Sequence, residues 1–153
     1  MMKSRRKNAI IFKNKIVNVF MKDGKKHTSE KILLKSSKLI QKLSRKNFKS
    51  LAQLAIVNST SAFKLNEQVM KKGKRKSKKV TPSFIIKDSL RVMTALKFIK
   101  NTVQKKKNSA NSFKNLSNEL LASSLLKGQS IEQKTKLQTQ ILLNKRYLSK
   151  FKW

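Results

Sequence analysis

The chain has 153 residues and carries 39 Lys and Arg against 6 Asp and Glu, which gives a formal net charge of +33. With 38% hydrophobic residues it can form a modest core, although self-repulsion at this charge weakens a compact chain that lacks a polyanionic partner. The absence of cysteine excludes disulfides, thiol catalysis and Cys-ligated zinc, and one His with six scattered acids leaves little for acid–base catalysis. We therefore expect one domain over residues 1–153 that is not an enzyme and holds no cofactor or metal.

Three helices are predicted before residue 60, with a basic N-terminal arm over residues 1–13. Apolar residues indicate the first helix from Ile10 to Met21, and Lys22-Asp23-Gly24 ends it because Gly24 supplies backbone freedom. The second is expected to start at Thr28-Ser29-Glu30, with an apolar face of Ile32, Leu33, Ser36, Leu39, Ile40 and Leu43. The third spans Asn47 to Asn58, with an apolar side of Phe48, Leu51, Leu54, Ala55 and Val57.

The helical period is lost over residues 62–86, where the sequence indicates a two-stranded ribbon with a basic tip. Phe63-Lys64-Leu65 alternates apolar and polar residues, and Phe84-Ile85-Ile86 is a β-prone run after Pro82. Between these segments lies Lys71–Lys79, in which seven of nine residues are basic. A disordered basic linker between two helical halves is an equally good interpretation of this composition.

Three more helices are predicted after the ribbon. Asp88-Ser89 caps the fourth, which Lys105-Lys106-Lys107-Asn108 closes, with an apolar face of Leu90, Val92, Met93, Leu96, Ile99 and Val103. Asn111-Ser112 opens the fifth and Lys127-Gly128 ends it, with Phe113, Leu116, Leu120, Leu121 and Leu125 as apolar residues. Ser130-Ile131-Glu132-Gln133 has the pattern of a capping box and begins the sixth, with Leu137, Ile141, Leu148 and Phe151 on one side. The fold class is therefore mainly α, with six helices and one β excursion in the middle.

No catalytic centre is indicated by the polar residues. His27 lies in a basic turn without a partner, which favours a solvated side chain or a donor to phosphate over a general base. Three glycines do not make a phosphate-binding loop or a dinucleotide fingerprint. Most phenylalanines fall on predicted apolar faces and indicate core packing. Phe151 and Trp153 are exceptions, because they lie in a basic-aromatic tail over residues 150–153 that could dock on the body or on RNA.

Basic residues gather at the ends of the predicted elements, which favours nucleic-acid binding. Loops between packed helices can converge on one side and follow a phosphate backbone, and such contacts make affinity fall steeply with salt. Lysine, which outnumbers arginine 33 to 6, suits phosphate neutralisation better than bidentate base reading. We therefore expect recognition of nucleic-acid shape by five clusters: Lys3–Lys7, Lys22–Lys26, Lys71–Lys79, Lys105–Lys107 and Lys145-Arg146.

Two other classes of protein compete with this interpretation. Charge alone also fits an architectural DNA-binding, nucleoid-like protein, although no recognition helix or wedge is recognisable. A cationic membrane-surface protein would need a wide apolar face, whereas the apolar stripes here are narrow and better suited to packing against each other. Competition with DNA and flotation with liposomes separate these alternatives.

Several segments resemble one family, the seventh protein of the small ribosomal subunit (ribosomal protein S-seven). The run from Lys15 to Lys26, with its Asp23-Gly24-Lys25-Lys26 turn, is similar to the family's apolar helix and acid-Gly-Lys-Lys turn, and Thr28 to Leu33 to its next helix start. Other similar pieces follow in the family's order: Ala95-Leu96-Lys97-Phe98-Ile99, Leu116-Ser117-Asn118-Glu119-Leu120, Lys127-Gly128 and Phe151-Lys152-Trp153. A Lys-rich insert stands where family members usually carry Gly-Gly and an aromatic segment.

The resemblance implies a bundle of six helices with a β-hairpin protruding between the third and fourth helices. It implies a structural protein that binds the 3′ major domain of small-subunit rRNA, organises assembly of the head and lies near the exit-site tRNA and the mRNA path. Its partners would be rRNA and other head proteins, with no membrane and no small-molecule substrate. The expected rRNA ligands are Arg5, Arg6, Lys7, Lys22, Lys25, Lys26, Arg91, Lys105, Lys106 and Lys107. The expected hairpin contacts to rRNA or tRNA are Lys71, Lys72, Lys74, Arg75, Lys76, Lys78 and Lys79.

Composition also bears on origin. Lys, Asn, Ile and Phe are plentiful while Gly and Pro are rare, which is the bias of an AT-rich genome. Together with the short N-terminus and the diverged motifs, this favours a mitochondrion-encoded member acting in the matrix, with a plastid or a bacterial cytoplasm as alternatives.

Overall fold

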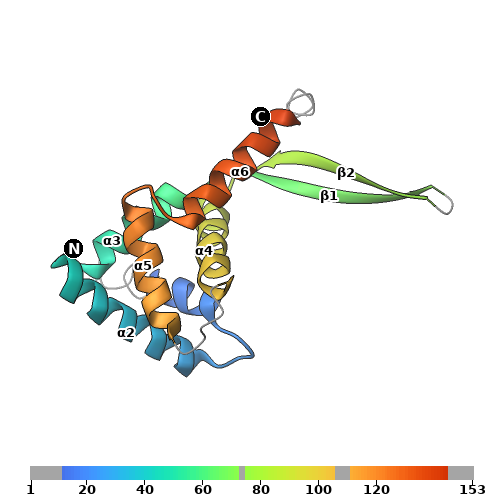
Figure 1. Ribbon diagram of the computed structural model, residues 1–153. Coiled ribbons are helices and arrows are strands. Elements are labelled where there is room, and N and C mark those ends of the chain that lie inside the picture. The colour runs from blue at the N-terminus through green and yellow to red at the C-terminus, as the bar shows by residue number, and fades with distance from the viewer. Residues whose placement is uncertain (1–11, 73–74, 106–110, 145–153) are drawn as a thin grey trace.

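The computed structural model describes residues 12–72, 75–105 and 111–144, and within the hairpin it describes only the backbone of residues 68, 70–72 and 75–79. Six helices and a two-stranded hairpin between the third and fourth helices make up this part of the chain, which confirms the predicted fold class. In chain order (Figure 1) they are a first helix over 12–20, α2 (Lys26–Ser44), α3 (Phe48–Ser59), β1 (Phe63–Lys72), β2 (Arg75–Phe84), α4 (Asp88–Lys105), α5 (Ser112–Ser124) and α6 (Gln129–Leu143).

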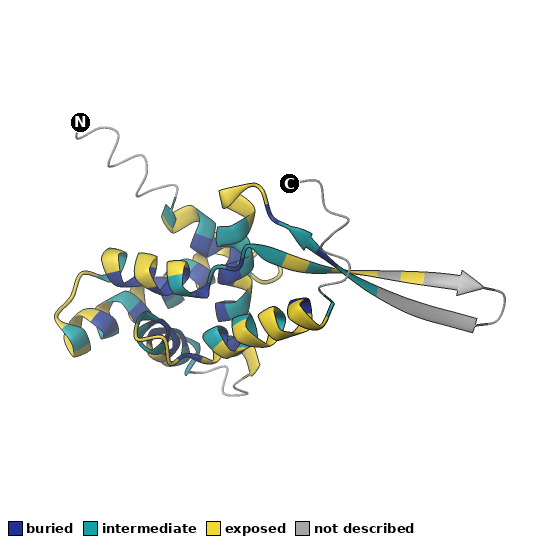
Figure 2. Ribbon diagram, turned by 90° about the horizontal axis from the view of Figure 1, so that it is seen from above, coloured by how far each residue is buried: buried dark blue, intermediate teal, exposed yellow. Residues whose placement is uncertain are grey.

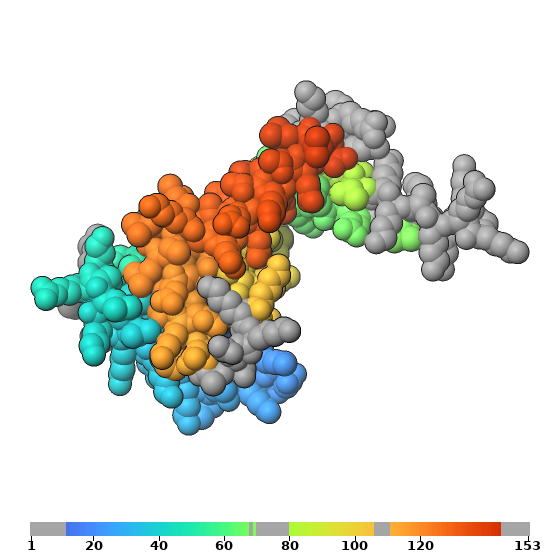
Figure 3. Space-filling view, viewed as in Figure 1, coloured from blue at the N-terminus to red at the C-terminus, as the bar shows by residue number. Residues whose placement is uncertain are grey.

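Helix α5 is at the centre of the helical body, because it packs against α2, α3 and α4. Figure 3 shows α5 and α6 covering one face of the body, with the end of α4 beside them. Residues coloured as buried lie where the helices face one another, and exposed residues lie on the outside of the body (Figure 2). The core draws on the first five helices and contains Ile16, Val17, Val19, Leu33, Ile40, Leu51, Ala55, Ile56, Ala95, Leu96, Ile99, Val103, Leu116 and Leu120.

Several buried positions hold serine instead of an apolar residue. Ser36, Ser59 and Ser117 are fully buried, and their hydroxyls donate to backbone carbonyls three or four residues earlier in their own helices. A buried hydroxyl is tolerated when it is hydrogen-bonded in this way, and its small volume allows helices to approach closely. The chain therefore packs its body with fewer large apolar side chains than its helix count would suggest.

The ribbon interpretation of residues 62–86 is confirmed and the linker interpretation is wrong. β1 and β2 pair antiparallel in one register, from Phe63 opposite Phe84 to Lys72 opposite Arg75. Ten residues per strand give a ribbon about 30 Å long, and Figure 1 shows it projecting from the helical body. Pro82 lies in β2 and is buried; a two-stranded ribbon tolerates it because each strand has one unpaired edge.

The base of the hairpin is fixed to the body by aromatic and arginine contacts. The rings of Phe63 and Phe84 meet edge to face at 5.5 Å between centroids. The guanidinium of Arg91, in the first turn of α4, lies 5.1 Å from the centre of the Phe84 ring and its Nε donates to the Ile85 carbonyl at 2.8 Å. Ile85 is buried, and its N–H donates to Ala62 beyond the last strand pair. The direction of the ribbon is thus set by α4.

Two predicted helix starts are wrong in detail. Helix α2 begins at Lys26, and Ser29 lies buried inside its first turn, where its hydroxyl donates to the Val17 carbonyl of the first helix at 3.1 Å. Helix α6 begins at Gln129 after the cap residue Gly128, so Ser130 is not the cap residue of a capping box. In both cases a serine that looked like a local cap bonds to a segment distant in sequence.

Some predicted core residues are exposed, namely Leu43, Leu54, Val57, Leu90 and Leu125. On α3 the predicted Leu51 and Ala55 are buried, together with Ala52, Ile56 and Ser59. These positions also follow a spacing of three and four, and the small side chains of Ala52, Ala55 and Ser59 allow α3 to lie close to α5. The sequence pattern gave too much weight to large side chains and too little to alanine and serine.

In the turn between α5 and α6, a leucine occupies a backbone conformation that normally favours glycine. Leu126 has a φ of 61°, in the left-handed region, and the N–H groups of Leu126 and Lys127 donate to the Ser123 and Ala122 carbonyls. This is a Schellman motif, in which glycine usually takes the left-handed position. The predicted stop at Lys127-Gly128 is therefore displaced: α5 ends at Ser124 and Leu126 makes the turn.

Position 128 holds glycine because neighbouring atoms leave no room for a Cβ. A Cβ on Gly128 would lie 2.5 Å from Ser123 Oγ and 2.7 Å from Glu119 Oε1. Glu119 is 3% exposed and accepts from the Ser130 N–H at 2.8 Å, so its carboxylate caps the N-terminus of α6. The Ser123 hydroxyl lies 3.3 Å from Glu119 Oε1 and 2.7 Å from the Ser130 hydroxyl. We call these four residues, Glu119, Ser123, Gly128 and Ser130, the Glu119 joint.

Candidate nucleic-acid interface

A tight turn over residues 22–25, here called the signature turn, connects the first helix to α2. Asp23 and Gly24 both have positive φ, 51° and 70°, and the Lys25 N–H donates to the Lys22 carbonyl at 3.0 Å. This is the pattern of a type I′ turn, for which a short polar residue followed by glycine is the preferred sequence. The turn therefore presents Lys22 and Lys25 from a fixed backbone, next to Lys26 at the start of α2.

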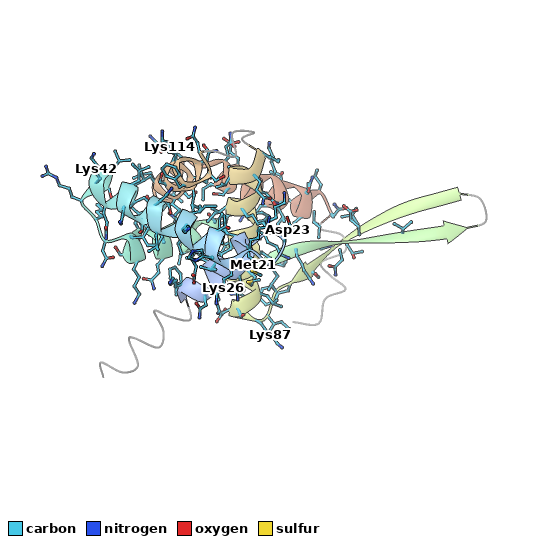
Figure 4. All side chains as sticks on the ribbon, turned by 90° about the horizontal axis from the view of Figure 1, so that it is seen from below. Met21, Asp23, Lys26, Lys42, Lys87 and Lys114 are labelled. Carbon is cyan, nitrogen blue, oxygen red and sulfur yellow. The ribbon has the colours of Figure 1, made fainter. Side chains whose placement is uncertain are left out.

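All three lysines of this segment, Lys22, Lys25 and Lys26, are exposed. Figure 4 shows Met21, Asp23 and Lys26 on the same side of the body, with Lys42 and Lys114 at the end that lies farther from the hairpin. Gly24 is open as well, since a Cβ there would meet nothing within 4 Å. The structure thus brings the three predicted ligands of the turn together on an accessible surface.

The signature turn borders a cavity of about 370 Å³, here called the turn cavity. The end of α4 and the first residue of α5 border it too, so segments eighty residues apart in the sequence meet there. Lys105, the last residue of α4, is exposed and directly follows the lining residue Gln104 in the chain. The lining residues are Phe20, Lys22, Asp23, Lys25, Thr28, Ser29, Ile32, Val103, Gln104 and Ser112.

The hairpin carries the longest basic run at its distal half. The register pairs Lys71 with Lys76 and Lys72 with Arg75 at the far end, and opposes Lys78 and Lys79 to residues 69 and 68. The backbone therefore spaces these cations along both strands, away from the base that α4 anchors (Figure 1). Lys74 lies outside the described residues.

Arg91 has a different environment from the other predicted ligands. Besides its contacts to Ile85 and Phe84, its Nη1 lies 3.6 Å from the Asp88 carboxylate. Three of its interactions thus serve the base of the hairpin and the first turn of α4. Contact with rRNA stays a prediction for this residue, and its positioning role was not visible in the sequence.

Five other predicted ligands, as well as the basic-aromatic tail over residues 150–153, fall outside the described residues. The five ligands are Arg5, Arg6, Lys7, Lys106 and Lys107.

Positive charge is poorly balanced within the described part of the chain. Its ion pairs are Lys13 with Glu30 at 3.8 Å and Arg91 with Asp88 at 3.6 Å. The carboxylate of Glu119 is enclosed in its joint, where it accepts hydrogen bonds from Ser123 and Ser130 and forms no ion pair with a lysine of the described residues. Exposed lysines are distributed from α2 to the hairpin base, as the labelled Lys26, Lys42 and Lys87 illustrate (Figure 4). This surface is suited to a polyanion that contacts the protein over a wide area.

The Glu119 joint is the feature that sequence reasoning missed. Its signal was present, since Glu119 and Gly128 both lie in segments with a family resemblance, but the two are nine residues apart and on either side of a turn. The joint holds the start of α6 against the end of α5 through buried hydrogen bonds. A further link holds the same corner: Asn58 Nδ2 donates to the Ser123 and Ser124 carbonyls at 3.0 and 3.2 Å.

The described residues also bear on two other classes of site, metal centres and membrane spans. In residues 12–72, 75–105 and 111–144, no three or more His, Cys, Asp or Glu side chains are grouped so that they could hold a metal ion. Among the same residues, none of the helices combines the length and apolar character that crossing a membrane requires.

Comparison with known proteins gives one family. The family model described as ribosomal protein S7p/S5e matches residues 1–144, which is nearly the whole chain. A comparison with curated protein sequences finds no significant match. The matched range includes the signature turn, the hairpin and the Glu119 joint. The chain therefore belongs to the family of ribosomal protein S7p/S5e and is a protein of the small ribosomal subunit.

Proposed function

We propose that the chain binds the 3′ major domain of small-subunit rRNA early in assembly and organises the head of the subunit. The observation that carries this proposal is the signature turn, which holds Lys22, Lys25 and Lys26 exposed on a fixed backbone near the end of α4. Lysines on a fixed backbone lose less backbone conformational entropy when they bind phosphate than lysines on a long flexible loop do. Family membership supplies the class of partner, and this geometry supplies a site for its backbone.

The hairpin extends the proposed interface toward rRNA or the exit-site tRNA. A ribbon about 30 Å long that is anchored by Arg91 can carry the Lys71–Lys79 run well away from the body. We expect the hairpin to lie near the exit-site tRNA and the mRNA path, with other head proteins of the small subunit as partners. Replacing the seven basic residues of the run by Ser is expected to lower both the affinity for rRNA and its salt dependence. An unchanged salt slope would count against hairpin contact.

We also infer that the protein acts in the mitochondrial matrix, with a plastid or a bacterial cytoplasm as alternatives. The support is compositional, since 33 Lys against 6 Arg and only 3 Gly and 1 Pro reflect an AT-rich coding sequence. Fractionation of cells that produce the chain, followed by detection in organelle ribosomes, tests this inference.

The test of rRNA binding is a competition experiment with the full-length protein. Labelled 3′ major domain RNA is the probe, and the competitors are unlabelled 3′ major domain, the 5′ domain of the same rRNA and duplex DNA of equal length. We expect the 3′ major domain to compete at least tenfold better than either of the others at physiological salt. Equal competition by duplex DNA would instead support the architectural DNA-binding alternative. Equal competition by the 5′ domain would show that the protein binds rRNA through charge alone, without preference for one domain.

A further inference from the structure

The turn cavity has a floor and a rim of different chemistry. Phe20, Ile32 and Val103 form an apolar floor that continues into the core, where Val103 is buried and the other two pack against it. Lys22 and Lys25 stand on the rim and are exposed. A mostly apolar pocket with a few polar groups at its mouth is the usual form of a site for one small organic group.

Size and charge restrict the occupant. About 370 Å³ lies within the range of about 300–1,000 Å³ typical of small-molecule pockets and is larger than a bound water requires. The exposed lysines on the rim, with Lys26 adjacent in the chain to Lys25 and Lys105 to the lining residue Gln104, favour an anionic group at the mouth of the cavity. The apolar floor favours a flat or bulky uncharged group inside the cavity.

We propose that the turn cavity takes one extruded nucleotide of the protein's RNA partner. The base would enter the cavity over Phe20, and its phosphate would stay outside with Lys22 and Lys25. Unpaired bases in RNA loops and bulges are commonly splayed out and bound on aromatic side chains in this way. This inference rests on the proposed function, because it assumes an RNA partner, and it adds a base-reading element to a surface otherwise made for phosphate.

The remaining polar groups of the lining fit a base edge better than a bare phosphate. The Asp23 carboxylate would repel a phosphate but accepts hydrogen bonds from base N–H groups. Thr28 and Gln104, both exposed, add hydroxyl and amide groups that can donate or accept. The Ser29 hydroxyl donates to the Val17 carbonyl, so it has no proton to donate to a base and could only accept. Because the Asp23 carboxylate can accept from the two adjacent donors of guanine, N1–H and N2–H2, whereas uracil offers only N3–H between two carbonyls, a guanine is expected over a uridine.

The experiment fills the cavity from its exposed lip, which spares the core. Gln104→Trp and Thr28→Trp place an indole at the mouth, and Asn101→Trp and Gln41→Trp are matched controls at exposed positions of the same helices outside the lining. Full-length variants that keep the wild-type circular dichroism and thermal transition are compared on 3′ major domain RNA. Affinity is measured across a salt series, and individual bases are probed with dimethyl sulfate and kethoxal.

We expect both filling variants to bind about tenfold more weakly with an unchanged salt slope, because they block a base without removing a cation. One unpaired base that wild-type protein protects should become reactive again, and the controls should behave as wild type. Wild-type affinity and base protection in the filling variants would overturn the inference. So would equal losses in the controls, which would indicate crowding of the surface, or an effect seen only in assembled subunits, which would indicate a protein side chain as the occupant.

The failure of the inference can be told apart from failure of the proposed function. If wild-type protein prefers the 3′ major domain but the filling variants bind it equally well, only the nucleotide site is excluded. If wild-type protein shows no such preference, the proposed function fails, and the same variants are then compared on the RNA that wild type binds most tightly. An unchanged affinity there would again overturn the nucleotide site.

Discussion

The two turns of this chain that resemble family motifs use glycine for opposite reasons. In the signature turn, Gly24 has a φ of 70° and open space where a Cβ would be. In the turn after α5, Gly128 has no unusual φ, but a Cβ there would collide with Ser123 and Glu119. In the first turn, which faces outward, glycine allows a positive φ. In the second, which faces inward, glycine avoids a collision between a Cβ and neighbouring side chains.

This difference separates the turn that we expect to bind RNA from the turn that stabilises the fold. The outward turn carries Lys22 and Lys25 and has few partners of its own in the described residues beyond its backbone hydrogen bonds. The inward turn carries the Glu119 joint, whose hydrogen bonds join α5 to α6. Changes in the joint should therefore act on stability, and changes in the signature turn should act on RNA binding.

The largest expected effect is that of Glu119→Ala. It removes the acceptor of the buried Ser130 N–H, and an unsatisfied buried group costs about 1–3 kcal/mol, whereas the Ser123 hydroxyl keeps the Ser130 hydroxyl as a partner. We expect the free energy of unfolding, measured by urea titration, to fall by about 1–3 kcal/mol. Glu132→Ala is the control, since Glu132 is an exposed glutamate on α6, and it should change stability by less than about 0.5 kcal/mol. Equal effects of the two substitutions would show that the joint is not a stabilising unit.

Gly128→Ala should have the next largest effect. The new methyl group would lie within 3 Å of two side-chain oxygens, so the joint must shift to accommodate it. Overpacking of this kind costs about 1–3 kcal/mol, which thermal unfolding would detect as a lowered midpoint. Restoration of stability in the double variant Gly128→Ala, Ser123→Ala would confirm that the collision with the serine is the cause. No loss of stability in the single variant would contradict the inward packing of this turn.

Gly24→Ala and Leu126→Gly should change stability in opposite directions and by a smaller amount. Alanine at position 24 would be forced to a positive φ, at a cost of about 1 kcal/mol, although nothing would collide with its methyl group. Glycine at position 126 would relieve the same strain in an exposed leucine with φ of 61°, and should raise stability by up to about 1 kcal/mol. Two changes of the same sign in chemical denaturation would argue against conformational strain as the cause.

The smallest effect on stability, and the largest on binding, is expected from replacing Lys22, Lys25 and Lys26 together by Ser. All three are exposed, so unfolding should change by less than about 0.5 kcal/mol. The slope of log affinity against log salt should fall by about 2 to 3, because each phosphate contact contributes about 0.7–0.9.

The control for this variant removes the same charge from the other end of α2, with Lys38, Lys42 and Lys46 replaced by Ser. These residues are exposed as well, and Figure 4 shows Lys42 far from the turn. If both triple variants lower the salt slope equally, the turn is one part of a diffuse positive field and not a specific contact.

Much of the fold was predictable because its signals are local. The spacing of apolar residues located six helices, and the loss of that spacing after residue 62 located the hairpin. The choice between a ribbon and a linker could not be made from the sequence, because lysine-rich strands lack the apolar alternation that identifies a ribbon. The pairing is instead supported at the base by Phe63, Phe84 and Arg91, which come from both strands and a helix.

The features that were missed depend on partners far away in the sequence. Ser29 and Ser130 resemble local caps, but they bond to Val17 and to the Glu119 joint. The turn cavity exists because the signature turn meets the end of α4, about eighty residues later. Composition could identify the lysines as a surface for phosphate, but it could not show that an apolar floor lies beside them.

The most direct test of the account is directed hydroxyl-radical probing in assembled small ribosomal subunits. The chain has no cysteine, so a single Lys26→Cys variant can carry an iron chelate at one place, and Lys42→Cys carries it at the far end of the same helix. The account predicts strong cleavage of the 3′ major domain of the rRNA from position 26 and weaker cleavage there from position 42. Cleavage from position 26 that is absent, or confined to another rRNA domain, would contradict it.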